Sequence, residues 1–237
     1  MISMQTLLLK FSGPLQSWGV SSKFETRHTE KYPTKSAVVG MIAAALGLRR
    51  NDERIKELNQ LDFAVRIDQA GKLLHDYHIA RKYKNNGDLD RTYVTNRYYL
   101  EDAIFMVSVG CEDNKLVDKI EYSLKNPYFQ LFLGRRSNPI TADFIQGKYE
   151  TDALSCLKEL DWQASDWYKK QNPDISYLTI LADADLLEDN SQIFIKDHVD
   201  SFSQKHRKFN FRAMSKYFHP LIEKDYLHNH DAFSSID

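Results

Sequence analysis

The chain has 237 residues, enough for one large domain or two small ones with a substantial core. Its 32 lysines and arginines nearly balance its 33 aspartates and glutamates, so binding of nucleic acid would have to depend on local basic patches. Its two cysteines, Cys111 and Cys156, lie far apart and away from histidines at metal-ligand spacing, which argues against a disulfide framework, a zinc site and a metal cofactor.

The apolar runs are short. None approaches the roughly 18 apolar residues of a membrane span, and residues 7–9 are too few for the apolar region of a secretory signal. We therefore predict a cytoplasmic protein without membrane contact.

The N-terminal part predicts a strand, a long polar loop and a helix. Residues 6–11 form an apolar run typical of a buried strand. Thr34 or Ser36 can cap a helix that starts near residue 35, and Gly47 suits its left-handed end. The helix is apolar nearly all round, so we expect it to be buried, with Gly40 allowing another element to approach closely.

The first turn of this helix is a candidate anion site. Its free backbone N–H groups, the Ser36 hydroxyl and Lys35 together favour a phosphate or a carboxylate. The alternative is ordinary N-capping, which the residues alone favour.

The loop before the helix holds further candidates. Gln16 and Ser17 precede Trp18, and Arg27 belongs to a basic stretch. Gln16 is a candidate for contacting a base edge and Trp18 for stacking on a base. A role for Trp18 as a packing anchor of the loop is an equally open hypothesis.

The next elements predict a short amphipathic helix at residues 53–61 and a hairpin with arms at 63–67 and 73–79. Residues 81–99 then contain almost no aliphatic side chain and surround a turn at 85–88. We expect a projecting arm, because so polar a segment cannot lie in a core.

The projecting arm alternates cations with tyrosines. This pattern suits single-stranded RNA, whose phosphates need Lys or Arg and whose splayed bases need flat rings. The alternative is a solvated loop, and the residues alone do not decide between the two. The candidate RNA contacts are Arg81, Lys82, Tyr93 and Arg97.

Residues 103–109 are the strongest predicted strand, followed by a helix at 116–124 and a short strand at 131–133. The order of elements predicts an α+β fold, a ferredoxin-like or RRM-like antiparallel sheet backed by helices. We place this domain at 1–139, including a thumb at about 80–100, with a less regular, β-rich extension at 140–237 packed on it.

Two further basic stretches are candidates for contacting RNA. Arg135 and Arg136 lie on a turn, where guanidinium groups can grip phosphate with two parallel hydrogen bonds. A surface salt bridge is the alternative. The second stretch carries rings at Phe209 and Phe211, which we expect to face a core, beside four candidate cations. These cations are Lys205, Arg207, Lys208 and Arg212.

Several strings, in order over residues 7–139, together carry a family resemblance. They are Gly-Pro-Leu-Gln-Ser-Trp-Gly at 13–19, Arg27 with Thr29, Pro-Thr-Lys-Ser at 33–36, Ala-Ala-Leu-Gly at 44–47, Asp-Tyr-His at 76–78, Arg97 before Tyr99, and Leu-Gly-Arg-Arg-Ser at 133–137 with Pro139. These strings resemble the CasD family of type I-E CRISPR-associated proteins.

The resemblance implies a RAMP fold with a long thumb and a subunit of the Cascade complex. It implies that the subunit holds the 5′ handle of the crRNA, caps the backbone in antiviral defence, and contacts the backbone subunit and the large PAM-recognising subunit. Contact with target DNA would be indirect. No catalytic residue, metal or cofactor is predicted.

Two alternatives stay open. Type I-C relatives cut precursor crRNA without a metal, and His78 beside Tyr77 or His206 beside Lys205 would have to supply the acid–base groups. No triad is visible at a spacing that fixes its geometry. The other alternative is an assembly subunit whose basic arm contacts protein only.

Overall fold

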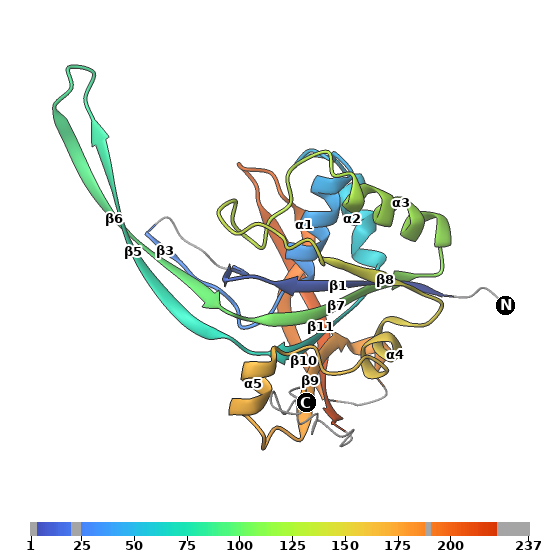
Figure 1. The fold of residues 1–237 in the computed structure, drawn as a ribbon. Coiled ribbons are helices and arrows are strands. Elements are labelled where there is room, and N and C mark those ends of the chain that lie inside the picture. The colour runs from blue at the N-terminus through green and yellow to red at the C-terminus, as the bar shows by residue number, and fades with distance from the viewer. Residues whose placement is uncertain (1–3, 20–24, 188–190, 222–237) are drawn as a thin grey trace, which may run out of the picture.

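A computed structural model describes residues 4–19, 25–187 and 191–221 (Figure 1). Its largest element is a seven-stranded antiparallel sheet with the order β10-β11-β9-β4-β7-β1-β8. The strands are β1 (Gln5–Ser12), β4 (Asp62–Gln69), β7 (Ile104–Cys111), β8 (Ile145–Tyr149), β9 (Tyr177–Asp183), β10 (Gln192–Ser201) and β11 (Lys208–Pro220).

The part β8-β1-β7-β4 of this sheet has the strand order of a ferredoxin-like fold. Helix α1 (Lys35–Ala45) connects β1 to β4, and α3 (Asn114–Lys125) precedes β8. The predicted α+β, ferredoxin-like architecture is confirmed. Strands β9, β11 and β10 extend the same sheet beyond β4, so the C-terminal part continues the sheet.

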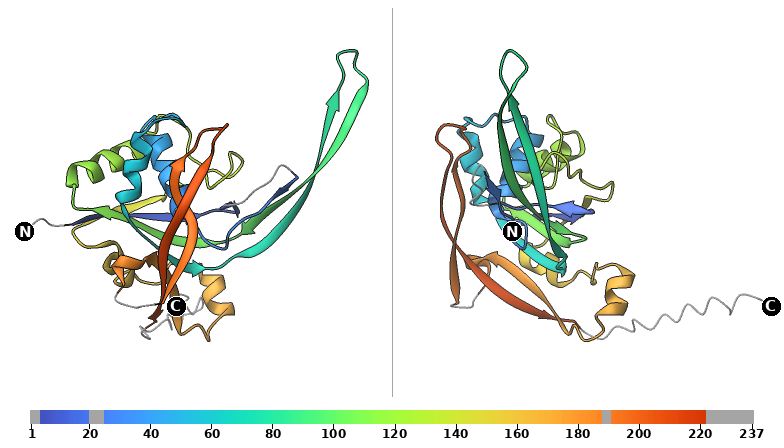
Figure 2. Two further views of the ribbon diagram at one scale, coloured as in Figure 1. Left: turned by 180° about the vertical axis from the view of Figure 1, so that it is seen from behind. Right: turned by 90° about the vertical axis from the view of Figure 1, so that its left-hand side faces the viewer.

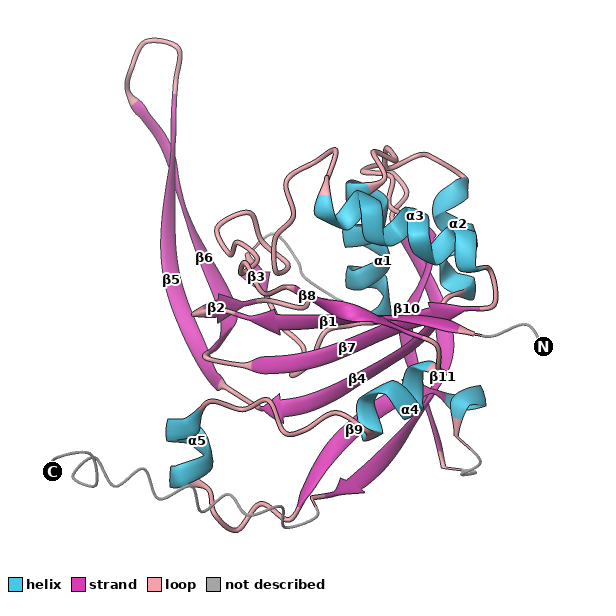
Figure 3. Cartoon of the chain, turned by 45° about the vertical axis from the view of Figure 1, so that its right-hand side comes forward, coloured by secondary structure: helices cyan, strands magenta, loops and turns pink. Residues whose placement is uncertain are grey.

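Helices cover both faces of the sheet (Figure 3). Helices α1, α2 (Arg54–Glu57) and α3, with the short helix η1 (Leu58–Gln60), lie over one face, and α4 (Ala153–Lys158) lies over the other. Leu7 and Leu9 of β1 join the core beneath α1, whereas Leu8 packs with the α4 residue Leu157. Burial on both faces explains why this strand is a continuous apolar run. The remaining helices are α5 (Asp166–Gln171) and η2 (Ala184–Leu186).

Helix α1 forms as predicted. The Thr34 hydroxyl accepts a hydrogen bond from the backbone N–H of Ala37 at 3.3 Å, and Gly47 follows the helix with a φ of 75°. A Cβ atom on Gly40 would lie 3.3 Å from the Phe202 ring. The glycine therefore gives the close approach that the sequence predicted.

The first turn of α1 binds carboxylates of the protein itself. The Lys35 backbone N–H donates to Asp197 at 2.9 Å, and Lys35 Nζ lies 2.9 Å from Asp183. Arg212 joins both carboxylates, through Nη1 to Asp183 at 2.5 Å and Nε to Asp197 at 2.9 Å. Carboxylates of the protein itself therefore occupy the predicted anion site. The resulting network connects α1 to β9, β10 and β11.

This network corrects three of the predicted RNA contacts. Lys35, Ser36 and Arg212 are buried, and the two cations already have carboxylate partners. Breaking such a buried pair is costly, because it leaves an uncompensated charge inside the protein. We therefore assign these side chains to the fold.

The thumb is a long hairpin of β5 (Lys72–Tyr83) and β6 (Leu89–Glu101) that projects far beyond the body (Figure 1). It begins at Lys72, earlier than the expected residue 80 or so. Two short strands, β2 (Leu15–Gln16) and β3 (Thr26–Arg27), pair with β6. The thumb thus belongs to a second, four-stranded sheet.

Two predicted β elements were wrong. The arms 63–67 and 73–79 do not pair, because β4 pairs with β7 and β9 whereas β5 pairs with β6. Gly71, with a φ of 72°, lies close to Ala103 and lets the chain leave the main sheet. Residues 131–133 make only one isolated bridge, from Phe132 to Pro139, and the fourth ferredoxin-like strand is β8.

Asp62 provides a pH test of the fold. Burial, together with the charges of Asp185 and Asp183, raises its pKa to about 6. Because the folded pKa exceeds the unfolded value, ionisation destabilises the fold as pH rises from about 4 to about 6. We expect Asp62→Asn to raise the free energy of unfolding at pH 7 by about 1–2 kcal/mol, after allowance for solvent screening. Denaturant unfolding at several pH values measures this difference.

Asp143→Asn is the matched control, because its hydrogen bond from Lys10 lowers the pKa of Asp143. The stabilising effect of the Asp143 carboxylate is therefore lost as pH falls, whereas that of the protonated Asp62 is lost as pH rises. An Asp62→Asn effect that is equal at pH 4 and pH 7 would contradict the prediction.

Candidate nucleic-acid interface

The base of the thumb is fixed on both edges of β6. Strand β5 pairs along one edge, and β2 and β3 follow one another along the other. The β3 residue Arg27 lies beside Arg97 in the parallel register. The inner half of the hairpin is therefore part of the body, and its outer half projects freely (Figure 1).

The Tyr98 carbonyl group is the meeting point of three segments. It accepts hydrogen bonds from Ser17 Oγ and from Arg135 Nη2, both at 3.1 Å. The same Arg135 nitrogen donates to the Arg27 carbonyl at 3.1 Å, and the guanidinium lies 4.1 Å from the centre of the Tyr99 ring. Ser17 and Arg135 therefore hold the thumb to the loop at 133–138.

Gly134 is required for this arrangement. Its φ is 82°, and a Cβ atom at this position would lie only 1.6 Å from the carbonyl oxygen of Ser17. The backbone of Ser17 also donates to the Leu133 carbonyl at 3.2 Å. The glycine lets the loop lie directly on the segment that carries Ser17.

Strand register divides the thumb into two faces, because residues directly opposite each other in a pair share a face. One face carries most of the thumb cations, and we call it the arginine face. Residue pairs Lys82–Arg91, Ala80–Tyr93 and Asp76–Arg97 belong to it. Arg27 and the Arg135 guanidinium join it through Arg97 and Tyr99. The structure thus places Arg27, Lys82, Tyr93, Arg97 and Arg135, from the predicted contacts, on one face along the length of the thumb.

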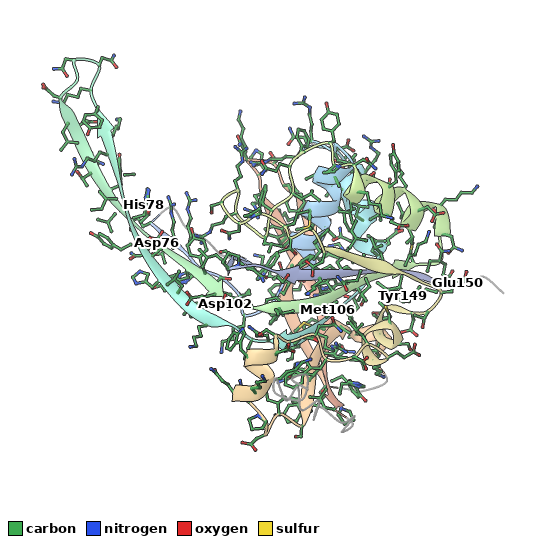
Figure 4. The ribbon with its side chains drawn as sticks, viewed as in Figure 1. Asp76, His78, Asp102, Met106, Tyr149 and Glu150 are labelled. Atoms are coloured by element: carbon green, nitrogen blue, oxygen red, sulfur yellow. The ribbon has the colours of Figure 1, made fainter. Side chains whose placement is uncertain are left out.

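Within the arginine face, several nitrogen donors have no partner among the described residues. They include two buried atoms, Arg97 Nε and Arg135 Nη1. The other end of Arg97 contacts His78, with 3.3 Å between Nη2 and Nδ1. Figure 4 shows Asp76 and His78 on the inner part of the thumb. Buried donors without acceptors are unfavourable, so an anion bound here would be stabilised.

The outer part of the arginine face mixes paired and unpaired cations. Lys82 forms an exposed ion pair with Asp90 at 2.9 Å. Arg91 is exposed, and its guanidinium lies 5.8 Å from the centre of the half-buried Tyr93 ring. Cations beside a ring are the combination that single-stranded RNA requires.

The opposite face of the thumb, which we call the apolar face, exposes large apolar side chains. Leu73, Tyr77 and Ile79 are 65%, 59% and 47% exposed. His75 and Tyr98 pair on this face and stack at 4.8 Å, and His28 stacks on Tyr98 at 5.6 Å. The predicted contact Arg81 also belongs to this face. Exposed apolar side chains grouped on one surface are typical of interaction sites.

Two predicted contacts before α1 are buried. Gln16 is fully buried, and its Nε2 donates to the Phe11 and Ala103 carbonyls at 3.1 Å and 2.7 Å. It therefore cannot reach a base edge. Trp18 is 1% exposed and stacks on Phe11 at 5.2 Å, so its role is that of a packing anchor. Ser17 is also buried and acts through Tyr98.

The other predicted cations lie elsewhere. Arg136 is exposed on the loop beside Arg135. Lys205, Arg207 and Lys208 belong to the turn between β10 and β11 and its end. Figure 2 shows this turn and the loop around residues 130–140 on different sides of the molecule. The C-terminal basic run is thus separate from the thumb.

The two rings of that run have different environments. Phe209 packs against the core, as expected, and against Phe202. Phe211 is 66% exposed, contrary to expectation. The pairing of β10 with β11 shifts between Ile195 and His198, and this irregularity turns neighbouring side chains to different faces.

Sequence reasoning did not single out Arg91 as a candidate, and it missed the approach of His78 to Arg97 and the division into faces. Counting outward from the turn at 84–88 would pair Lys82 with Asp90 and Arg81 with Arg91, but the register of the two strands shifts by one residue next to Tyr83. The structure therefore pairs Lys82 with Arg91 and places Arg81 and Arg91 on opposite faces. No described helix is long and apolar enough to cross a membrane, and the described residues contain no His, Cys, Asp and Glu group suited to a metal.

Comparisons with known proteins agree with one another. A family described as CRISPR-associated protein (Cas_Cas5) matches residues 6–215. The CRISPR system Cascade subunit CasD of Escherichia coli (strain K12) is 30% identical over 182 residues, covering 70% of this chain and 81% of the relative.

Two solved structures are similar over most of their length. A chain of a CRISPR RNA-guided surveillance complex has a TM-score of 0.74 and 28% identity, covering 91% of this chain and 90% of that one. The structure of a Cas protein has a TM-score of 0.65 and 29% identity, covering 91% and 95%.

Gly134→Ala tests how the thumb base is held. The added Cβ would collide with the Ser17 backbone, so we expect the loop to move and the Arg135 hydrogen bonds to break. The free energy of unfolding should fall by about 2 kcal/mol or more. Hydrogen exchange should also speed up in β3 and the inner part of β6.

Gly87→Ala, in the thumb turn, is the control, since it also has a positive φ of 90° but has no atom within 4 Å of the added Cβ. It should leave exchange at the thumb base unchanged. Equal exchange rates at the thumb base in wild type and Gly134→Ala would refute the proposed attachment.

Proposed function

This chain belongs to the Cas5 family of CRISPR-associated proteins, and on that premise we propose that it is a non-catalytic Cascade subunit that holds the 5′ handle of a crRNA. The arginine face of the thumb is the proposed site. The observation that carries the proposal is the alignment of Arg27, Arg91, Arg97 and Arg135 along one face, with Tyr93 beside Arg91 and Tyr99 beside Arg135. The relative is a Cascade subunit and the structural neighbour belongs to a CRISPR RNA-guided surveillance complex, which supports this assignment.

The chemistry of the arginine face suits a single strand held by shape and charge. Guanidinium groups bind phosphate through two donors at once, and a ring such as Tyr93 can stack on a splayed base. The net charge of the chain is −1, so attraction comes from this face and not from the whole molecule. Target sequence would be read by pairing with the guide.

The apolar face supports a role for the thumb in assembly. Leu73, Tyr77 and Ile79 are exposed on the side opposite the arginine face. A neighbouring protein would remove this surface from water. We infer that the thumb lies between the handle on one face and a protein on the other, the backbone subunit being the proposed partner. We also propose that the chain contacts the large PAM-recognising subunit.

The positions of the candidate catalytic histidines favour a non-catalytic role. His78 is on the thumb, where it contacts Thr95 and Arg97, and His206 is on the turn between β10 and β11. Acid–base cleavage of RNA needs a base and an acid on either side of one phosphate. Tyr77 and His78 are adjacent in β5 and therefore lie on opposite faces of the thumb, so they do not flank one phosphate.

Arg91→Ala and Arg81→Ala form a matched pair that tests the site. Both side chains are exposed, and they lie on opposite faces of the same part of the thumb. We expect Arg91→Ala to weaken binding of handle RNA about three- to tenfold, and Arg81→Ala by less than about twofold. Fluorescence anisotropy over a range of salt concentrations measures both, and the salt slope should fall by about 0.7 for Arg91→Ala only.

Equal losses from both variants would contradict binding on one face. Handle affinity unchanged in both variants, with loss of co-purifying backbone subunit, would favour the protein-only alternative. Incubation with precursor crRNA and a 2′-deoxy control decides the enzymatic alternative, since specific cleavage that needs the 2′-hydroxyl would overturn the non-catalytic assignment.

A further inference from the structure

A second group of cations lies where the turn between β10 and β11 meets the segment after α1. We call this group the basic corner. Its members are Arg50 and Arg207, whose charges interact, and the cations near them in sequence, Arg49 and Lys205; all four are exposed. Residues 50–53 and 200–202 line a common cavity of about 110 Å³, which shows that the two segments are neighbours.

The basic corner has a rigid base. The Asn59 side chain donates to the Val199 carbonyl at 2.8 Å and accepts from the Val199 N–H at 2.9 Å, which ties η1 to β10. Phe202 lies against Gly40 of α1 and against Phe209. The Arg207 guanidinium in turn lies 5.0 Å from the centre of the Phe209 ring. The cations are thus presented from fixed backbone.

The neighbouring carboxylates are already paired. Asp52 binds Arg54 at 2.6 Å, Glu53 binds Lys56 at 2.7 Å and Asp200 binds Lys208 at 2.9 Å. In the part of the chain that the structure describes, no ion pair is formed by any of the four cations of the basic corner. Among the described residues, these four charges therefore have no ion-pair partner.

Arg50 and Arg207 also act on each other. Partial desolvation lowers the pKa of Arg207, and the charge of Arg50 lowers it further. Like charges held together on fixed backbone are unfavourable, and a bound anion between them relieves the repulsion.

We propose that the basic corner binds phosphodiester groups of a nucleic-acid strand, as a second contact separate from the thumb. Three of its four cations are arginines, whose planar donors match phosphate. Among described residues, none of the large apolar side chains exposed on the surface falls within 47–60 or 199–210, although Phe211 and Tyr128, which lies against Gly47, are exposed at the margin. A protein interface would need an apolar centre, whereas a phosphate backbone needs only donors and charge.

Binding of a strand at the basic corner is independent of binding of the handle at the thumb. Figure 2 shows the turn between β10 and β11 away from the loop that carries Arg135. A strand bound at the corner is either another part of the RNA or DNA that approaches the complex. The phosphate chemistry is the same for both, so the probes must separate them.

The test compares wild type with Arg50→Ala/Arg207→Ala, using the full chain. The probes are labelled single-stranded RNA, DNA of the same sequence and a short DNA duplex, each measured by fluorescence anisotropy over a range of salt concentrations. We expect binding of at least one probe to weaken about tenfold or more, with a salt slope lower by about 1–2. The probe that loses most identifies the source of the strand.

Lys115→Ala/Lys119→Ala, which removes two exposed charges from α3, is the matched control and should change affinity by less than about twofold. Arg50→Lys/Arg207→Lys keeps the charge and should restore part of the affinity, which separates phosphate binding from a loss of folding. Combined with Arg91→Ala, the corner variant should show both losses, because the substitutions act at separate sites.

Affinities for all three probes within about twofold of wild type would overturn the proposal. A corner variant that keeps these affinities but no longer binds an acidic protein partner would also overturn the proposal. Loss of handle binding in Arg91→Ala alone would leave the proposed function standing while the basic corner fails. Loss of probe binding in the corner variant alone would support the basic corner while the proposed function fails.

Discussion

The carbonyl group of Tyr98 connects the thumb to the rest of the protein. It accepts hydrogen bonds from Ser17 and Arg135, which belong to segments far apart in the sequence. A two-stranded hairpin is marginally stable in water by itself, so this attachment and the pairing of β6 with β2 and β3 give the thumb its direction. Gly134 makes the contact possible, because any side chain there would meet the Ser17 backbone.

The cations of this nearly neutral chain have two different fates. Lys35 and Arg212 are buried with Asp183 and Asp197, where they hold α1 against the extension of the sheet. The arginines of the thumb and the basic corner stay at the surface, and several have no carboxylate partner among the described residues. The same residue types therefore stabilise the fold in one place and offer sites for phosphate in another.

The sequence was sufficient where local chemistry decides the structure. The Thr34 cap, the buried α1 and the ferredoxin-like order followed from periodicity and end residues. Long-range pairing was harder to predict. Strand β8 carries glycine and polar residues, so its place beside β1 depends on a partner more than a hundred residues away. Residues 131–133 looked more like a strand, and yet they form one isolated bridge.

For the candidate site too, the sequence predicts the residue types but not their long-range arrangement. Its arginines and tyrosines were visible in the sequence, but their faces depend on the register of β5 and β6. Burial could not be seen either, since nothing local distinguishes Gln16, which bonds to two core carbonyls, from an exposed glutamine.

The most direct test of the account is photo-crosslinking of handle RNA to the full chain, with the crosslinked residues identified by mass spectrometry. Binding of the handle on the arginine face predicts crosslinks at Tyr93 and none at Tyr77 on the apolar face. Crosslinks at Tyr77 without any at Tyr93 would contradict it.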